Sequence, residues 1–279
     1  MQRFITTIPL TFLLLGCNTE SCPENIFDSS VQEIKTGDWY KPTINTSWQI
    51  QLQGEINRSY SATLYDIDLF DSNKTVIQSL HDDGKKVICY FSAGSYEDWR
   101  EDKNSFSQEL VGEKLDGWAG ERWLDISNEN LAPIMRKRLD LAVEKGCDGV
   151  DPDNMDSYTN NTGFNLSADN QLAYNKFIAN EARKRGLSVG LKNDLNQIVE
   201  LEPYFDFSIN EQCNIYNECD KLTPFIEANK PIFNIEYHKK YIENNNNERD
   251  NLCSDTKALK IQTLILPLLL DASFGYNCD

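Results

Sequence analysis

The chain has 279 residues, of which 40% are hydrophobic, so it can bury a sizeable core as one large domain or two small ones. Acidic residues outnumber basic ones by 44 to 27, giving a formal charge of -17, which argues against nucleic acid as a partner because its binding needs clustered Lys and Arg. An acidic surface attracts a cationic partner, or simply keeps the protein soluble.

The N-terminus has the pattern of an export signal. Arg3 precedes an apolar run at 8–15 that is too short to span a membrane as a helix. The run ends in Leu-Leu-Gly-Cys at Cys17 and resembles a bacterial lipoprotein signal. We therefore expect residues 1–16 to be removed, Cys17 to carry a lipid, and residues 17–38 to form a tether. A plain secretory signal is the alternative, and both predict an exported protein without a membrane-spanning helix.

From residue 39 onward a short apolar strand, a polar loop and a helical stretch repeat along the chain. The clearest helices are expected at about 74–83, 131–145 and 168–184. The strands are expected at 48–52, 62–69, 86–91, the beginning of 146–158, 187–191, 205–209, 231–235 and 263–266.

Eight strands that alternate with helices predict a single-domain (β/α)8 TIM barrel over residues 39–279. A doubly wound open sheet is the competitor, but it predicts a glycine-rich phosphate loop, and neither GxGxxG nor a P-loop is present. Because the chain ends just past the eighth strand, we expect a final outer helix to be short or absent. A long insertion at 92–130, rich in aromatic and charged residues, suggests a functional loop.

Eight cysteines fit an oxidising compartment. If Cys17 carries a lipid, seven remain, so at least one lacks an internal partner. With only two histidines and no CxxC pair, we expect no metal site, and no motif indicates a cofactor. The best candidate bridge joins Cys213 to Cys219 across a short loop, and further candidate pairs are Cys253 with Cys278 and Cys89 with Cys147.

Polar or acidic residues stand at the C-terminal end of nearly every predicted strand, where a TIM barrel has its active site. They are Asp66, Asp68, Tyr90, Ser92, Asp151, Asp153, Lys192, Asn193, Asp194, Asn210, Glu211, Glu236 and Tyr237. The opposite strand ends show no such excess. We therefore expect these side chains to bind or transform the substrate.

A ring of acids and aromatic residues fits glycoside hydrolysis, which needs two carboxyl groups beside the scissile bond, one held protonated and the other ionised. The sequence has no GxSxG elbow and no Cys/His catalytic pair. A Schiff-base lyase that uses Lys192 is the enzymatic alternative. A barrel that binds polysaccharide without turnover is the non-enzymatic one.

Five runs of sequence resemble the family 114 glycoside hydrolases, the endo-α-1,4-polygalactosaminidase family related to spherulin-4-like proteins. They are 65–71 (YDIDLFD), 87–96 (VICYFSAGSY), 146–158, 190–194 (GLKND) and 210–213 (NEQC). The resemblance covers roughly residues 39–237. It implies a TIM barrel that cleaves α-1,4-linked galactosamine polymers, which are often partly deacetylated and hence cationic, and the acidic charge of this chain suits such a substrate.

The resemblance also implies roles for two carboxyl groups. The second aspartate of the Asp-Gly-Val-x-x-Asp pattern is Asp153, the expected nucleophile, with Asp151 as the fallback on the same face. The glutamate of Asn-Glu-Gln-Cys is Glu211, the expected general acid/base. Alternation from Phe207 and Ile209 places Glu211 on the outward face, so we expect the strand to end or bulge at Asn210. A retaining mechanism requires the two carboxyl groups to lie ~5 Å apart.

The other strand-end residues leave alternatives open. Asp66 and Asp68 bind amino groups of the sugar or pair with Lys192, and Glu236 and Tyr237 are expected to line the cleft. Asp148 is expected to be structural. In the insertion, Trp118 and Trp123 line subsites or pack the loop.

Overall fold

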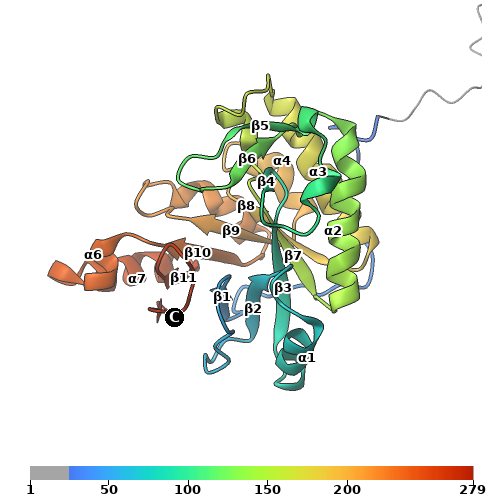
Figure 1. Ribbon diagram of the computed structural model, residues 1–279. Helices are drawn as coiled ribbons and strands as arrows, with labels where there is room; N and C mark the ends of the chain where they lie inside the picture. Colours follow the sequence, from blue (N-terminus) through green and yellow to red (C-terminus); the bar gives the residue numbers. More distant parts are fainter. Residues whose placement is uncertain (1–24, 279) are drawn as a thin grey trace, which may run out of the picture.

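Eight parallel strands lie side by side in chain order and curl into a (β/α)8 barrel in the computed structural model, which describes residues 25–278 (Figure 1). A short antiparallel strand, β12 (Tyr276–Asn277), pairs with β11 at the end of the sheet. The parallel strands are β1 (Trp48–Gln51), β2 (Leu64–Asp68), β3 (Lys86–Ser92), β7 (Gly149–Asp153), β8 (Ser188–Lys192), β9 (Phe207–Glu211), β10 (Ile232–Glu236) and β11 (Gln262–Ile265).

Helices follow six of the eight parallel strands, β2, β3, β7, β8, β9 and β10, whereas none separates β1 from β2. Several of these helices have recognisable end signals. A proline stands in the first turn of α2, and the chain leaves this helix at Gly146, whose φ of 91° is accessible mainly to glycine. A capping box between Ser167 and Asn170 begins α3. The helices are α1 (Lys74–Asp82), α2 (Ala132–Lys145), α3 (Ala168–Lys184), α4 (Ile198–Leu201), α5 (Thr223–Glu227), α6 (Lys239–Glu243) and α7 (Glu248–Ala258).

The sheet separates two apolar layers. The outer layer joins the strands to α1, α2 and α3. The inner layer fills the barrel with side chains such as Trp48, Ile50, Phe207 and Ile209. Trp48 also helps to close the barrel, because its indole donates a hydrogen bond of 3.2 Å from β1 to the carbonyl of Gln262 on β11.

The insertion after β3 forms a small antiparallel sheet rather than a structureless loop. Its order is β4 (Ser95–Glu97), β6 (Glu121–Leu124), β5 (Val111–Lys114), and it lies beyond the end of β3 (Figure 1). Two buried arginines hold it to the barrel. Arg100 pairs with Glu97 and Asp68, and Arg138 on α2 binds Asp102 and the carbonyl of Ser92.

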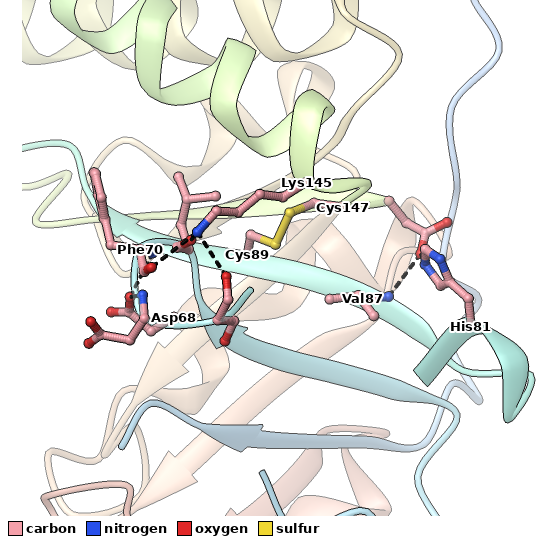
Figure 2. The surroundings of a disulfide bond; sticks show 11 residues. Asp68, Phe70, His81, Val87, Cys89, Lys145 and Cys147 are labelled. Atoms are coloured by element: carbon pink, nitrogen blue, oxygen red, sulfur yellow. Dashed lines mark hydrogen bonds and ion pairs between the residues drawn. A yellow bond between two sulfur atoms is a disulfide. The ribbon is translucent and has the colours of Figure 1, made fainter. Parts of the chain in front are cut away.

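Three disulfides confirm the expected pairing. They join Cys89 to Cys147, Cys213 to Cys219 and Cys253 to Cys278. Figure 2 shows the first, which ties β3 to the residues just before β7. Beside it, the Lys145 amine donates to the carbonyls of Leu69, Phe70 and Ser72 at 2.7–3.0 Å, which fixes the turn after β2 (Figure 2). Asp148 is structural as expected, since it accepts hydrogen bonds from His81 and the Val87 amide.

Residues on the N-terminal side of the predicted boundary at residue 39 also pack against the barrel. Phe27 is buried against Tyr174 and Phe177 of α3, and Asn180 of α3 accepts from the Ile34 amide at 3.0 Å. Residues 26–34 therefore belong to the domain rather than to a tether. The predicted signal and Cys17 lie outside the described residues. Within residues 25–278, no helix is both long and apolar enough to cross a bilayer.

Candidate active site

One cavity of about 130 Å3 opens at the C-terminal end of the barrel, where side chains of neighbouring strands meet. Leucines, among them Leu52 and Leu268, line another part of its wall. The predicted site residues that line it are Tyr90, Asp153, Lys192, Asn193, Glu211 and Tyr237.

Three donors hold the carboxylate of Asp153 at the end of β7. The Tyr90 hydroxyl donates to Oδ2 at 2.8 Å, the Lys192 amine lies 3.2 Å from Oδ1, and the Asn154 amide donates to Oδ1 at 2.8 Å. These contacts come from β3, β8 and the turn after β7. The orientation of Asp153 is therefore fixed before any substrate arrives.

Glu211 at the end of β9 has a different set of partners. The Tyr237 hydroxyl donates to Oε1 at 2.5 Å, and the Asn193 side-chain amide donates to Oε2 at 3.4 Å. The expectation that Phe207 and Ile209 face outward is wrong, because both pack inside the barrel. Glu211 shares their face, so it reaches the cavity without a bulge in β9.

Strands β7, β8 and β9 each end at a residue that lines the cavity, and the next residue has a positive φ. Asn154, Asn193 and Gln212 follow β7, β8 and β9 and have φ values of 61°, 50° and 61°. This left-handed conformation is uncommon for residues other than glycine and turns the chain sharply away from the strand. The side chain of Asn193 thereby reaches Glu211, and its Oδ1 also accepts from the Glu211 backbone amide at 3.0 Å.

Two further aspartates lie below the cavity, fully buried in the barrel. Burial and the charge of Asp151 raise the pKa of Asp66 well above its ordinary value, and burial likewise raises the pKa of Asp151. These surroundings favour the neutral, protonated form of Asp66. It shares the inner face but does not touch the cavity.

Lys192 lies between Asp151 and Asp153, at 3.8 and 3.2 Å. Burial alone lowers the pKa of Lys192, but the charges of Asp151, Asp153 and Glu211 outweigh it and raise that pKa well above its ordinary value. A Schiff base needs a neutral amine. The geometry thus disfavours the lyase alternative and makes Lys192 a counter-ion for the acids.

Two of the predicted substrate-binding residues form hydrogen bonds with the insertion instead of lining the cavity. Asp68 is buried in a two-point contact with Arg100, at 3.0 and 2.6 Å. Ser92 is also buried, where its hydroxyl lies 2.6 Å from that of Ser95 and accepts from the Asn154 side-chain amide. Both side chains support the site but do not line the cavity.

Asn210 and Glu236 are on the opposite face of β9 and β10 from the cavity, contrary to expectation. Both are fully buried, and Asn234 lies within 3.5 Å of each. Glu236 also accepts from the Asn214 backbone amide at 2.8 Å. Glu236 and Asn234 bind the backbone of the loop that Cys213 and Cys219 close, and neither Asn210 nor Glu236 lines the cavity.

Two acids that the sequence did not single out line the cavity. Glu121 begins β6, and Asp156 follows β7 by three residues. Burial raises the pKa of Glu121 to about 7 and that of Asp156 to about 6. Asp156 lies only three residues after Asp153, so its place in the loop at the strand end could have been predicted. Nothing in the sequence distinguishes Glu121 from the other acids of the insertion. Trp118 lines the cavity and is 41% exposed, whereas Trp123 is buried at 8%.

The comparison with known protein families bears directly on this arrangement. The model of glycoside-hydrolase family GH114 matches residues 29–279. This chain belongs to family GH114. Its membership makes the chain a glycoside hydrolase.

Two solved structures of glycoside hydrolases resemble the chain. Ega3 of Aspergillus fumigatus, crystallised in complex with galactosamine, is 42% identical, with a TM-score of 0.81, and the match covers 87% of this chain and 99% of Ega3. The glycoside hydrolase domain of PelA from Pseudomonas aeruginosa is 12% identical, with a TM-score of 0.63 over 82% of this chain and 96% of that domain. The second likeness concerns the fold alone. No curated protein sequence matches the chain.

Proposed function

We propose that this GH114 enzyme cleaves α-1,4-linked galactosamine polymers internally, with Asp153 as nucleophile and Glu211 as general acid/base. The observation that carries the proposal is that these two carboxyl groups share one cavity but have unlike partners. Asp153 has the Lys192 ammonium at 3.2 Å, and Glu211 has the Tyr237 hydroxyl at 2.5 Å.

The unlike partners suit the two roles. A nucleophile must be ionised when the substrate binds, and the Lys192 ammonium 3.2 Å from Asp153 provides the counter-charge of a carboxylate. A general acid must carry a proton that it can give to the leaving oxygen, and Glu211 has no cation within ion-pair distance among the described residues. Asp151 is a weaker candidate for nucleophile, because it is fully buried and does not line the cavity.

The proposed reaction proceeds with retention in two steps. Asp153 attacks the anomeric carbon while Glu211 protonates the leaving oxygen, which gives a covalent glycosyl-enzyme. Glu211 then removes a proton from water, and this water releases the sugar from Asp153. Tyr90 holds the Asp153 oxygen that does not contact Lys192, so the attacking carboxylate keeps its orientation through both steps.

The substrate is proposed from charge and from the galactosamine that Ega3 holds. The chain has a formal charge of -17, and Glu121 and Asp156 add carboxyl groups to the cavity wall. A partly deacetylated, cationic polymer complements such a surface. The three disulfides fit an exported enzyme, and we propose that a lipid on Cys17 anchors it to the cell envelope.

The test is the release of reducing ends from partly deacetylated α-1,4-galactosaminogalactan. Wild type should be active, Asp153→Asn and Glu211→Gln should each lose activity by at least about 1,000-fold, and Glu113→Gln, an exposed change in the insertion, should match wild type. Activity that survives Asp153→Asn but not Asp151→Asn would move the nucleophile to Asp151. Binding without turnover in wild type would favour the sugar-binding alternative. The anomeric form of the first product, read by NMR, decides between retention and inversion.

A further inference from the structure

A pair of buried aspartates, Asp66 on β2 and Asp151 on β7, lies inside the barrel and beneath the catalytic cavity. Both residues are 0% exposed. In the sheet, Asp66 stands between Ile50 of β1 and Ile88 of β3, which both belong to the inner apolar layer. A carboxylate in such surroundings destabilises the fold unless it is paired or protonated. The pair therefore calls for a functional reason.

The two carboxyl groups have only each other as hydrogen-bond partners. Within residues 25–278, no backbone amide and no donor side chain forms a hydrogen bond to any of the four carboxyl oxygens. The side chains of Asp66 and Asp151 form a hydrogen bond with one another. Ionised carboxylates can only accept hydrogen bonds, so this contact requires a proton on one of the two groups.

Lys192 connects the pair to the proposed nucleophile. Its amine lies 3.8 Å from Asp151 and 3.2 Å from Asp153, and its side chain is 4% exposed. In the described part of the chain, no other Lys or Arg lies within ion-pair distance of Asp66 or Asp151. If Asp66 and Asp151 were both ionised, three carboxylates would compete for one ammonium group. A proton on the pair removes this excess of negative charge.

We propose that Asp66 and Asp151 share a single proton and that this pair positions Lys192 beneath the nucleophile. The inference rests on the proposed function of Asp153 and deepens it. Asp66 donates the shared proton to Asp151, which leaves one negative charge below Lys192. This charge holds the ammonium group while Asp153 is ionised, and also after Asp153 has become a neutral glycosyl ester. Neither aspartate of the pair lines the cavity, so both act through Lys192.

The shared proton links the stability of the fold to pH. The charged groups around the pair are Asp153 of β7, Lys192 of β8 and Glu211 of β9. Burial, followed by the charge of Asp151, raises the pKa of Asp66 well above its ordinary value. An aspartate of the unfolded chain ionises at about pH 4. The folded chain thus keeps a proton that the unfolded chain releases, and this contribution to stability falls as pH rises.

Urea denaturation between about pH 5 and pH 8 tests the shared proton in wild type and in Asp66→Asn, which keeps an N–H donor toward Asp151 but has no proton to release. We expect the unfolding constant of wild type to rise over this range by at least about 100-fold relative to that of Asp66→Asn, since one proton changes it by up to about 10-fold per pH unit. Asp82→Asn, an exposed change on α1, should follow wild type. Asp66→Val removes the same proton and serves if Asp66→Asn does not fold. An equal pH dependence in wild type and the Asp66 variant would overturn the inference.

Turnover and crystal structures of the same variants test the positioning of Lys192. Asp66→Val removes a hydrogen bond to a charged group, so kcat/KM on galactosamine oligomers should fall by about 10- to 150-fold, and Asp66→Asn should recover most of this loss. Equal losses in the two variants would overturn the positioning role. So would a crystal structure of Asp66→Val in which the Lys192 amine keeps its place between Asp151 and Asp153. If wild type hydrolyses no galactosamine polymer, the proposed function fails, while the urea and crystallographic results still decide the inference.

Discussion

The buried ion pairs of Arg100 attach the insertion to the barrel, and substitution of Arg100 tests how much this attachment stabilises the fold. It is 5% exposed, contacts Asp68 at 3.0 and 2.6 Å, and pairs with Glu97 at 2.8 Å. Both acids are also buried, at 4% and 2% exposed. Arg100→Met keeps the length of the stem and removes the charge. Asp68 then loses its cation, and Glu97 keeps only Arg138, at 4.0 Å.

The expected loss is large. Removal of one partner from a buried ion pair costs about 3–5 kcal/mol, and in a domain of this size each kcal/mol lowers Tm by about 2–4 °C, which gives a fall of about 6–20 °C. The loss should also depend on pH. Burial raises the pKa of Glu97 even beside Arg100. A carboxyl group with a raised folded-state pKa takes up a proton on folding, so its contribution to stability falls as pH rises.

Urea denaturation at pH 5 and pH 8 measures both effects. Arg100→Met should lose more free energy of unfolding at pH 8 than at pH 5, and adding Asp68→Asn should restore part of the loss. Arg58→Met, which removes an exposed pair with Asp83, is the matched control and should cost less than about 1 kcal/mol. The reasoning is refuted if Arg100→Met costs no more than this control, or if its loss grows toward acid.

Three further predictions concern the site and the frame around it. Tyr237→Phe removes a hydrogen bond of 2.5 Å to Glu211, so kcat/KM should fall about 10- to 150-fold at unchanged Tm, and a fall below about 3-fold would contradict the role of Tyr237. Asp156, with a pKa raised by burial to about 6, loses its charge as pH falls from 7 to 5, so KM for deacetylated oligomers should rise over that range. Asp156→Asn should reduce this rise, and an unchanged KM profile would count against the charge of Asp156. Replacement of both Cys89 and Cys147 by Ala opens a link between residues 58 apart and should cost about 4 kcal/mol in urea denaturation, whereas a loss under 1 kcal/mol would show that the bridge contributes little.

The strands and the two central carboxyl groups could be predicted because their signals are local. Apolar runs bounded by turns gave all eight parallel strands, and the acids at their ends placed Asp153 and Glu211 at one rim. The cysteine pairs also followed from short loops and neighbouring strands. In each of these cases the sequence pattern that supports the prediction lies within one strand, one loop or two neighbouring strands.

The remaining assignments depend on contacts between distant segments. Both faces of β9 are buried, so alternation gives the two faces but not which of them lies inside the barrel, and Asn210 was therefore placed on the wrong side. Asp68 and Asp66 look alike in sequence, yet only Asp68 meets an arginine, from a segment 32 residues away. Glu121 belongs to the insertion, and only the folded structure shows that it lines the cavity.

The two acids that we propose to be catalytic and the insertion residues that line the same cavity come from separate parts of the protein. Asp153 and Glu211 are carried by parallel strands of the barrel, while Trp118 and Glu121 belong to an added sheet that a few buried contacts fasten to it. Substitutions confined to residues 111–124 should therefore change the wall of the cavity while Asp153 and Glu211 keep their positions. For laboratory evolution, the insertion is therefore the part of the cavity wall that can be varied without changing the strands of the barrel.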